Sequence, residues 1–487
     1  MRAGSMAYAT KASACLLIGS LCCATVCRGA PAAWPADAPR ALRHAGLASE
    51  DPTASPPEEE TAEASDLADL DETTRPWLAV GEVTGTNLVI WAIDRYVRQR
   101  DWARVDPEVW LDNLRYGLAW DQDDFPNNQL SHPYHGAAYF NAARANGYGF
   151  WGTTPFVLLG VAQWEWLAEN EPPSVNDIVN TSLGGLALGE VLFRLSSMLL
   201  DNEARGLDRA RREIVAGIID PLRGLNRALT GEAWHRTSTP PEWEPLYFAT
   251  RAHIGYQRMR GGSPGNVGEF FVDLDVEYGD ALQSAIRDPF DDFTVNVQLA
   301  SKAEYLLDHA FVEGVLSSST LRADDTERLI FGIRQQFEYV DTHSYELGGQ
   351  SFGFGLLYRR QAPAGNELRA AGFLRALVLG GISSEYAGAV GRSYDYGPGL
   401  GMQFESSFGR WPWSLASAKT SILWIHTLDG ADGDHLLSEA FLQLDVPLYR
   451  GLGIGASAGV FSRYSSFSNF ADVKQLVPRF QVFLSKH

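Results

Sequence analysis

The feature that most constrains the fold is a change of periodicity near Pro240. From there to the end of the chain, apolar and polar residues alternate, and a period of two places each kind on one face of a β-strand. In the clearest run the apolar residues are Phe270, Val272, Leu274, Val276 and Tyr278, and the acidic residues between them are Asp273, Asp275 and Glu277. We count about twelve such segments, separated by turn residues, as expected for a barrel.

These segments are long for strands of a soluble protein. They run for about ten to fourteen residues, as membrane-spanning strands do, whereas strands of soluble sheets most often have about five or six. A strand can cross a bilayer only in a closed barrel, because an open edge leaves backbone groups without hydrogen bonds. The sequence therefore predicts an α+β chain, in which an N-terminal helical domain precedes a C-terminal antiparallel transmembrane β-barrel of about twelve strands.

The N-terminus has the pattern of a secretory signal. Arg2 and Lys11 precede an apolar run over 12–26, and the small residues of GAPAA follow it. All four cysteines lie inside this segment, so the exported chain is expected to contain no disulfide and no cysteine nucleophile. We expect a signal peptide over 1–33.

Three regions are expected after the signal peptide. Residues 34–76 are acidic, contain proline and have few large apolar side chains, which predicts a disordered linker. A helical domain is expected over 77–235, and the barrel over 240–487. Export together with a barrel predicts the bacterial outer membrane, with its lipid as a partner and the helical domain on the periplasmic side or folded into the barrel mouth. The formal net charge of −20 argues against a nucleic-acid partner, because phosphate binding needs a basic face.

Helical periodicity marks three segments outside the centre of the helical domain. Trp77–Arg100 is predicted to be a packed helix and not a membrane span, because Glu82, Asn87 and Asp94 interrupt it. Phe156–Glu169 is a second helix. Residues 202–229 form amphipathic helices that break near Pro221, with one apolar stripe of Ile214, Ile218, Leu222, Leu225 and Leu229.

Capping signals subdivide the centre of this domain. Pro133 suits the first turn of a helix, with Ser131 or His132 near its cap. Ser174 with Asp177 resembles a capping box that opens another helix.

The same region carries an unusual ordered set of residues. They are Asp124, Phe125, Asn128, His132, Pro133, Tyr134, Gly136, Ala143, Arg144, Gly147, Trp164, Glu165, Glu169, Pro173, Ser174, Asn176, Asp177, Thr181, Gly184, Gly185, Gly189 and Glu190. On these residues, the region 77–230 resembles an uncharacterised bacterial envelope family that has only a domain-of-unknown-function label. A serine expected after the Gly147 turn is replaced here by Thr153 or Thr154. The family has no established activity, so the resemblance implies an envelope context and no mechanism.

Four residues of this region are candidates for chemistry. His132, His135, Glu165 and Glu190 offer imidazole and carboxyl groups, which serve as general acids, general bases or metal ligands. A compact signature such as HExxH is absent from the sequence, so we predict no metal and no cofactor. The alternative is structural: His132 caps a helix, and Glu190 pairs with Arg194 or Arg144 inside a packed domain.

Several further polar residues lie close to these four in the sequence. They are Asn128, Asn141, Arg144, Asn176, Asp177 and Arg194. A buried polar group is unfavourable unless it is hydrogen-bonded, so this density predicts either a polar network or a ligand pocket.

The predicted barrel also carries many charges on its inward faces. The acidic residues are Asp273, Asp275, Glu277, Glu304, Asp308, Glu313 and Glu338, and the arginines are Arg251, Arg334, Arg369, Arg375 and Arg463. Either the acidic groups bias an open lumen towards cations, or the two kinds of charge pair in a closed interior, as is usual for small barrels.

Two motif matches in the barrel do not predict catalysis. The GxSxG pattern at 455–459 and the glycines of 397–401 lack the strand-turn-helix setting that their chemistry requires. A barrel-wall hydrolase is also disfavoured, because none of the ten histidines is followed two places on by serine.

Two functions remain for this chain. The first is a non-enzymatic envelope protein that is structural, or that binds or transports an envelope lipid or protein. The alternative is an enzyme acting on envelope lipid or glycan through the four candidate residues. A further possibility places the apolar stretches 156–164 and 178–200 in a bilayer. The polar residues within or next to them would then have to face protein; they are Glu165, Asn180, Glu190 and Arg194.

Overall fold

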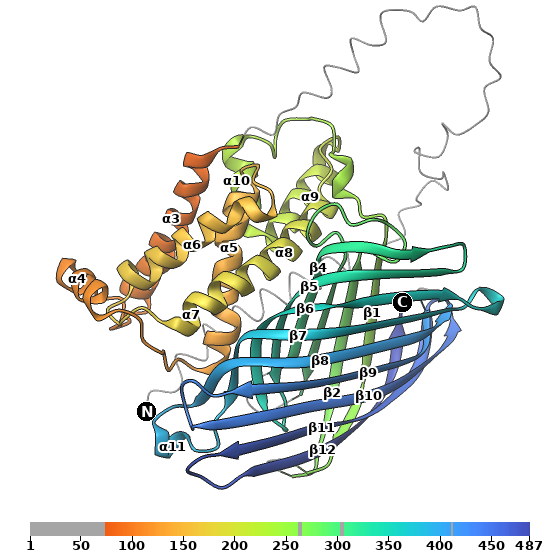
Figure 1. Cartoon of the computed structure of the whole chain (residues 1–487). Helices are drawn as coiled ribbons and strands as arrows, with labels where there is room; N and C mark the ends of the chain where they lie inside the picture. The colour runs from red at the N-terminus through yellow and green to blue at the C-terminus, as the bar shows by residue number, and fades with distance from the viewer. Residues whose placement is uncertain (1–73, 262–264, 302–305, 411–412) are drawn as a thin grey trace, which may run out of the picture.

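The computed structural model describes residues 74–261, 265–301, 306–410 and 413–487. Within them, a helical region precedes a closed antiparallel barrel of twelve strands, which confirms the predicted fold class (Figure 1). The predicted signal peptide and nearly all of the predicted linker lie outside the described residues.

The helical region consists of short helices, several of them extended by π-helical turns. The α-helices are α3 (Pro76–Ala92), α4 (Pro107–Tyr116), α5 (His132–Arg144), α6 (Thr154–Gln163), α7 (Val175–Val179), α8 (Gly185–Leu199), α9 (Gly206–Ile219) and α10 (Pro221–Thr230). The π-helical turns are η2 (Ile93–Val97), η3 (Asn127–Ser131), η5 (Trp164–Ala168) and η6 (Asn180–Gly184), and a 3-10 turn, η4 (Phe150–Thr153), precedes α6. These bounds confirm the predicted helices, including the break at Pro221.

The capping signals give one correct and one wrong helix start. Ser174 Oγ accepts the backbone N–H of Asp177 at 3.2 Å, so the predicted cap of α7 is confirmed. Neither Ser131 nor His132 caps α5, because the helical run begins earlier, and Asp124 Oδ1 accepts the N–H of Asn127 at 2.9 Å. Pro133 lies inside this run, directly after the wide turn η3, where its missing N–H is tolerated.

The barrel closes by pairing its first strand with its last. In order around the wall the strands are β1 (Phe248–Met259), β2 (Val267–Tyr278), β3 (Phe293–Ala300), β4 (Leu307–Ala323), β5 (Glu327–Asp341), β6 (Glu346–Gln361), β7 (Glu367–Ser383), β8 (Tyr394–Arg410), β9 (Trp413–His426), β10 (Gly433–Tyr449), β11 (Leu452–Phe467) and β12 (Val473–Lys486). Each pairs antiparallel with its neighbours, and β1 pairs with β12. A short helix, α11 (Ala387–Val390), lies between β7 and β8.

Most connections at one end of the barrel are shorter than most of those at the other. At the short-turn end, three connections are short: 324–326, 362–366 and 450–451. β1 begins and β12 ends there, and one long connection, 279–292, is also at this end. The opposite, long-loop end carries the connections 342–345, 384–393, 427–432 and 468–472.

The predicted alternation of faces is confirmed in the wall. Asp273, Asp275 and Glu277 line an internal cavity, whereas Phe270 and Val272, which precede them in β2, are exposed on the outside. The GxSxG pattern lies within β11, with Ser457 facing the lumen, so it has no nucleophile-elbow geometry.

The lumen has an apolar part and a polar part. At the long-loop end, buried apolar side chains from eight strands meet across it: Met259, Val340, Tyr345, Leu347, Leu377, Ile382, Leu423, Ile425, Leu437, Phe461 and Val477. We call this group the apolar plug. Towards the short-turn end, the lumen instead contains a cavity of 420 Å³ that reaches Gly279 and His487.

The helical domain packs against the outer wall of the barrel and not in its mouth (Figure 1). Leu188, Val191 and Leu192 of α8 contact outward side chains of β3, β4 and β5, which are Val295, Val297, Ala310, Val312 and Phe337. The contact runs the height of the wall, because Arg194 pairs with Asp291 at the short-turn end and Asn128 Nδ2 donates to Tyr396 Oη near the long-loop end. The expectation that these helices fold into the mouth is therefore wrong.

Two helices of this domain approach each other closely behind the wall. A Cβ on Gly136 of α5 would lie 1.8 Å from the carbonyl oxygen of Thr181, and one on Gly185 would lie 2.5 Å from the backbone of Gly136. Only glycine permits this spacing, which holds the segment carrying His132 against the segment carrying Asp177.

The outer helices of this domain are polar inside and apolar outside. In α3 the buried residues include Glu82 and Asn87, whereas Leu88 and Val89 are exposed. In α9 and α10 the buried side chains include Arg209, Arg223 and Arg227, and four residues of the predicted apolar stripe, Ile214, Ile218, Leu225 and Leu229, are exposed. The stripe exists as predicted, but it faces away from the protein.

Candidate functional site

Three buried residues of the helical domain form the first candidate site. His132 at the start of α5 lies with Nε2 3.6 Å from Asp177 Oδ1 in α7. Glu165 in η5 is the third member, and one ligand-type atom from each residue lies within 4.8 Å of the others. We call these three residues the helical-domain cluster.

The surrounding backbone and side chains hold this cluster in place. Glu165 Oε2 accepts the N–H of Ser174 at 2.8 Å, and Nδ1 of His132 lies 3.2 Å from Thr181 Oγ1. Asn176 Nδ2 donates to Asp177 Oδ1 at 3.1 Å. Each member therefore has a hydrogen-bond partner within the domain, and the three side chains are almost fully buried.

Burial and mutual charge shift the titration of this cluster. Burial, and next the neighbouring Asp177 carboxyl, raise the pKa of Glu165 to about 8. Burial alone lowers the pKa of His132, but the carboxyls of Asp177 and Glu165 more than reverse this and leave it above its ordinary value. Burial similarly raises the pKa of the nearby Asp123 to about 7. These shifts favour a charged His132 beside the Asp177 carboxylate and a protonated Glu165.

The other two candidate residues lie in different surroundings. Glu190 is fully buried and is bound by Arg144 at 2.9 Å and by Arg194 at 2.7 Å, so both of the pairings considered from the sequence occur. The His135 ring packs against Tyr139 and Trp164, with ring centroids 4.7 Å apart in each pair. Burial lowers the pKa of His135 to about 3, which keeps this ring neutral.

The residues predicted as a polar network or pocket have separate partners. Asn128 bonds to Tyr396 of the barrel, and Asn176 Oδ1 accepts the N–H of Asp121 at 3.0 Å. Arg144 and Arg194 share Glu190, while Asn141 is buried within α5. These contacts form several small groups between helices rather than one pocket around a single point.

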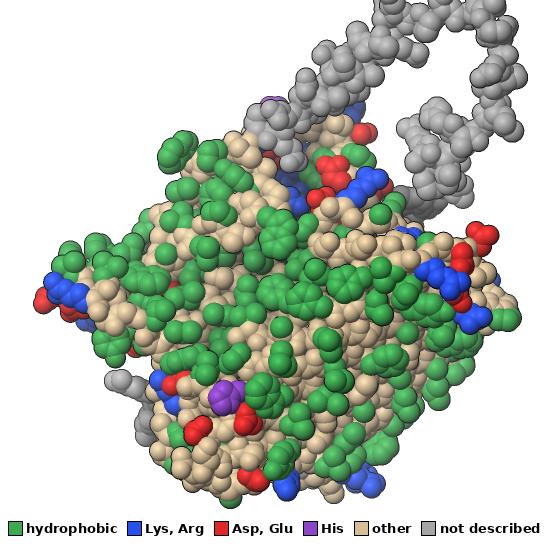
Figure 2. Space-filling model, in the orientation of Figure 1, with side chains coloured by type: hydrophobic (Ala, Val, Ile, Leu, Met, Phe, Trp, Pro, Cys, Tyr) green, Lys and Arg blue, Asp and Glu red, His purple; other side chains and the backbone are tan. Residues whose placement is uncertain are grey.

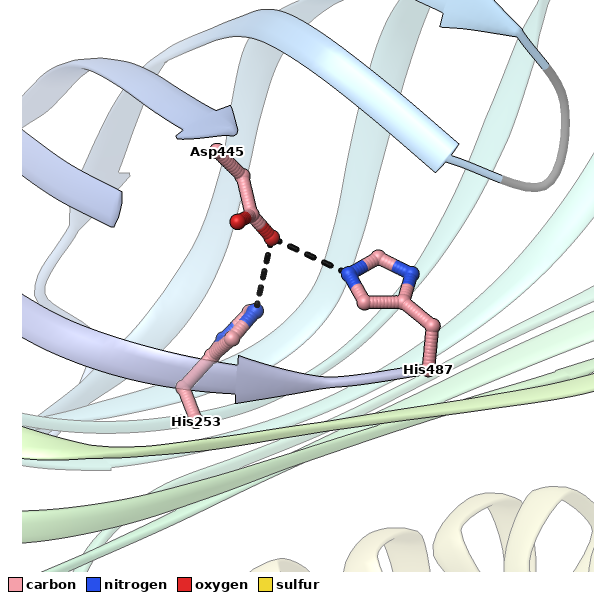
Figure 3. A group of neighbouring side chains, drawn as sticks. All are labelled: His253, Asp445 and His487. Carbon is pink, nitrogen blue, oxygen red and sulfur yellow. Dashed lines mark hydrogen bonds and ion pairs between the residues drawn. The ribbon is translucent and has the colours of Figure 1, made fainter. Parts of the chain in front are cut away.

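A second site, which the sequence analysis did not find, lies in the lumen cavity (Figure 3). His253 of β1, Asp445 of β10 and His487 after β12 point toward one another. Asp445 Oδ2 lies 3.0 Å from His487 Nε2 and 3.8 Å from His253 Nε2. We call these three residues the lumen cluster.

Barrel closure explains why the sequence analysis missed this cluster. His253 and His487 stand at opposite ends of the barrel sequence and meet only because β1 pairs with β12. The alternation of inward and outward residues could have indicated His253 as a lumen residue. His253 pairs with Asp273 across β1 and β2, on the acidic face noted in the sequence.

The charges predicted for the lumen are largely paired. Arg334 binds Glu313 at 3.2 Å, Arg369 binds Asp280 at 2.8 Å, and Arg251 binds Glu277. Arg375 binds Glu338 and Arg463 binds Glu385, at 2.6 and 3.3 Å. Glu304 lies outside the described residues. Even so, the cavity wall carries nine carboxyl groups and only five arginine or lysine side chains, so carboxyls exceed them by four.

Fold and sites define a twelve-stranded β-barrel with a helical domain on its outer wall. Residues 117–222 match the sequence profile described as a domain of unknown function (DUF3943). Residues 117–222 are therefore similar to this uncharacterised family, which confirms the resemblance drawn from the sequence for that stretch. No curated protein matches the chain.

The chain is also similar to solved barrel structures. The NanC porin is 9% identical, with 48% of this chain and 98% of that chain covered and a TM-score of 0.27. The KdgM porin is 10% identical, with 48% and 98% covered and a TM-score of 0.21. The Pseudomonas putida toluene transporter TodX is 7% identical, with 50% and 90% covered and a TM-score of 0.21. We transfer no ligand or transport role from them.

Proposed function

We propose that this protein spans the bacterial outer membrane and that its lumen is a blind binding cavity rather than a pore. The observation that carries this proposal is the apolar plug, which joins eight strands across the long-loop end of the lumen. Of the roles left open by the sequence, binding an envelope component fits such a cavity better than passage through the barrel.

The outer face of the wall supports the membrane-spanning part of the proposal. Large apolar side chains are exposed on β1, β2 and β6–β12; one example from each is Ile254, Phe270, Phe354, Leu374, Leu400, Ile422, Leu442, Ile454 and Phe480. A tilted strand needs about 9–11 residues to cross a bilayer, and all of these strands are longer. Burying this surface in lipid removes it from water.

The connections support an orientation in which the cavity faces the periplasm. Outer-membrane barrels have short periplasmic turns and longer extracellular loops. The cavity lies towards the short-turn end, and the apolar plug lies at the long-loop end. The plug would then close the barrel against the outside.

The exposed surface of the helices supports a place beside the barrel in the plane of the membrane. The domain covers the wall from Asp291 to Tyr396, which is the level of the exposed apolar residues. Exposed apolar side chains lie on α3, α9 and α10 of the domain, and Figure 2 shows apolar side chains on the helical domain as well as on the barrel. A domain held in the periplasm would instead expose these side chains to water.

One helical run of this domain also has the length and composition of a membrane span. Among the described residues, Val175–Leu199 passes this test, but 72% of its apolar window is buried inside the protein. It lies between the wall and the outer helices, so it is the core of the domain, and the outer helices make the contact with lipid.

Electrical recording tests the blind lumen. The full chain, folded in detergent and inserted in a planar lipid bilayer, is expected to give no stepwise ion conductance. The comparison is a double variant, Leu437→Gly with Leu423→Gly. It removes two side chains of the apolar plug and so weakens the seal. Stable conductance steps from the unmodified protein would contradict a blind cavity.

The enzyme alternative keeps one observation in its favour, the convergence of His132, Glu165 and Asp177. A purified His132→Ala variant with an assembled barrel distinguishes the two. Loss of a phospholipid or glycan hydrolysis that the unmodified protein performs would favour the enzyme.

A further inference from the structure

The lumen cluster has the construction of a metal site. His253 is the best-defined member, because its Nδ1 lies 3.0 Å from Asp273 Oδ1, and Asp273 Oδ2 accepts a hydrogen bond from Asn296 at 3.0 Å. This contact fixes the ring and leaves Nε2 directed at Asp445. His253 is 4% exposed, yet Nε2 has no hydrogen-bond partner among the described residues. A histidine held by a carboxylate through one nitrogen, with the other nitrogen free, is the usual arrangement of a metal ligand.

The other two members are positioned as firmly. Ser485 Oγ donates to Asp445 Oδ1 at 2.7 Å, which leaves Oδ2 as the oxygen facing both histidines. The His487 ring stacks on Trp413 with centroids 3.6 Å apart and an interplanar angle of 19°. Trp413 Nε1 also donates to the backbone oxygen of Asp445 at 3.1 Å. One indole therefore holds two of the three groups.

We propose that His253, Asp445 and His487 bind one divalent transition-metal ion of the zinc type. Zinc takes imidazole nitrogen and carboxylate oxygen at about 2.0–2.2 Å, which separates neighbouring ligand atoms by about 3.3 Å in a tetrahedral site. The observed separations of 3.0 and 3.8 Å lie on either side of this value. The fourth position would face the cavity of 420 Å³, where water or a ligand group can occupy it.

Binding requires the proton between His487 and Asp445 to leave. In the absence of metal, His487 Nε2 and Asp445 Oδ2 share a hydrogen bond. A metal takes the lone pair of His487 Nε2 and the carboxylate oxygen, so the proton on this nitrogen must move to Nδ1 of the same ring or leave to solvent. At low pH, protons compete with the metal for these groups, and binding is weaker. The excess of carboxyls over arginine and lysine in the cavity wall favours a cation at this position.

The two other groups with suitable spacing are less suited to a metal. In the helical-domain cluster, Glu165 Oε2 and Asp177 Oδ1 already accept hydrogen bonds, His132 is bonded through Nδ1, and all three side chains are buried inside the domain. The group of His253, Asp273 and Asp275 relies on Asp273, both of whose oxygens already accept hydrogen bonds. Asp273 therefore acts as the support of the lumen cluster and not as a ligand.

This inference rests on the proposed function, since it names the class of ligand for the blind cavity. The blind cavity and the metal site are contradicted by different experiments. Conductance by the unmodified protein would contradict the blind cavity, whereas metal binding is measured on protein in detergent and does not depend on the seal.

Zinc chloride titrated into the full, untagged, chelator-treated chain in detergent, followed by isothermal calorimetry, tests the proposal. We expect one zinc ion per chain. His487→Ala should abolish this binding, and the positioning variant Asp273→Asn should weaken it by about 10–100-fold. His426→Ala is the matched control, because it removes a histidine that also lies 3.0 Å from an aspartate but outside the lumen.

Far-UV circular dichroism and heat-modifiable gel migration establish that each variant has folded. Binding of one zinc ion by the unmodified chain and by His426→Ala, with loss in His487→Ala, supports the site. Zinc binding that is equally tight in His487→Ala and the unmodified chain would overturn it, as would the absence of binding by the unmodified chain.

Discussion

The helical-domain cluster and the lumen cluster contain similar residues in opposite circumstances. Each brings histidine and carboxylate side chains within 4.8 Å of one another. In the helical-domain cluster each residue bonds to its own domain, and Glu165 and His132 have their partners in Ser174 and Thr181. In the lumen cluster, His253 also bonds through Nδ1, to Asp273, but its Nε2 has no hydrogen bond among the described residues, and the group lines a cavity. The first arrangement stabilises a fold, and the second is prepared to bind.

This difference also separates two kinds of experiment. Changes in the helical domain should alter stability and leave binding unchanged. Changes in the lumen cluster should alter binding while the fold persists. The four predictions that follow test the stability of the helical domain, beginning with the largest effect.

Glu190→Ala should give the largest loss of stability. The change leaves Arg144 and Arg194 without their buried carboxylate, and breaking a buried ion pair from one side costs about 3–5 kcal/mol. Urea unfolding in detergent, followed by the helical signal in circular dichroism, measures it. Asp101→Ala, which removes an exposed pair with Arg104, is the control and should change stability by less than about 1 kcal/mol. Equal effects would show that the interior of the domain is not held by this pair.

Gly136→Ala should follow, because the added Cβ would meet the Thr181 carbonyl oxygen at 1.8 Å. Helix α5 must then move away from η6, and overpacking of this kind typically costs about 1–3 kcal/mol. Gly149→Ala is the control, because a Cβ added at Gly149 would have no neighbouring atom within 4 Å among the described residues. Unfolding of the two variants at the same urea concentration would contradict the close approach.

The pH dependence tests the charge state of the helical-domain cluster. The pKa of Glu165 rises on folding to about 8, so its contribution to stability is complete below its ordinary pKa and is lost as the pH rises towards 8. The raised pKa of His132 acts in the same direction, with its loss beginning above the ordinary value. The lowered pKa of His135 acts in the opposite direction, but only below its ordinary value of 6.5. The domain should therefore be more stable at pH 6.5 than at pH 8, and Glu165→Gln should flatten this slope. A slope that is unchanged in Glu165→Gln would assign it to other groups.

Ser174→Ala should have the smallest effect. It removes the side chain that accepts the Asp177 N–H, and loss of such a cap costs about 1 kcal/mol. Ser174→Asp, which can still cap, should recover most of the loss. A loss above that of Gly136→Ala would mean that Ser174 does more than cap α7.

The sequence predicted the barrel well because its signal is local. The alternation of apolar and acidic residues around Asp273 can be read from a few neighbouring residues. The outward positions of Phe270 and Val272 follow from this alternation alone. The cap at Ser174 was predictable for the same reason. The start of α5 was not, because the π-helical turn before His132 lets Pro133 lie inside a helix.

The remaining features depend on contacts between distant segments. His132 and Glu165 were recognised as candidates, but their separation from Glu190 depends on how the helices cross at Gly136. The outward face of Ile214 and its neighbours could not be assigned, since periodicity defines a stripe without saying what it faces. The lumen cluster needs the closure of β1 on β12, which no local pattern contains.

The most direct test of the difference between the two clusters is zinc binding by two matched variants, Asp177→Asn and Asp445→Asn. Each replaces one carboxyl by an amide of the same size. We predict that Asp177→Asn, once folded, binds one zinc ion with unchanged affinity and that Asp445→Asn does not. Loss of zinc in Asp177→Asn with retention in Asp445→Asn would contradict this assignment and move the binding site to the helical domain.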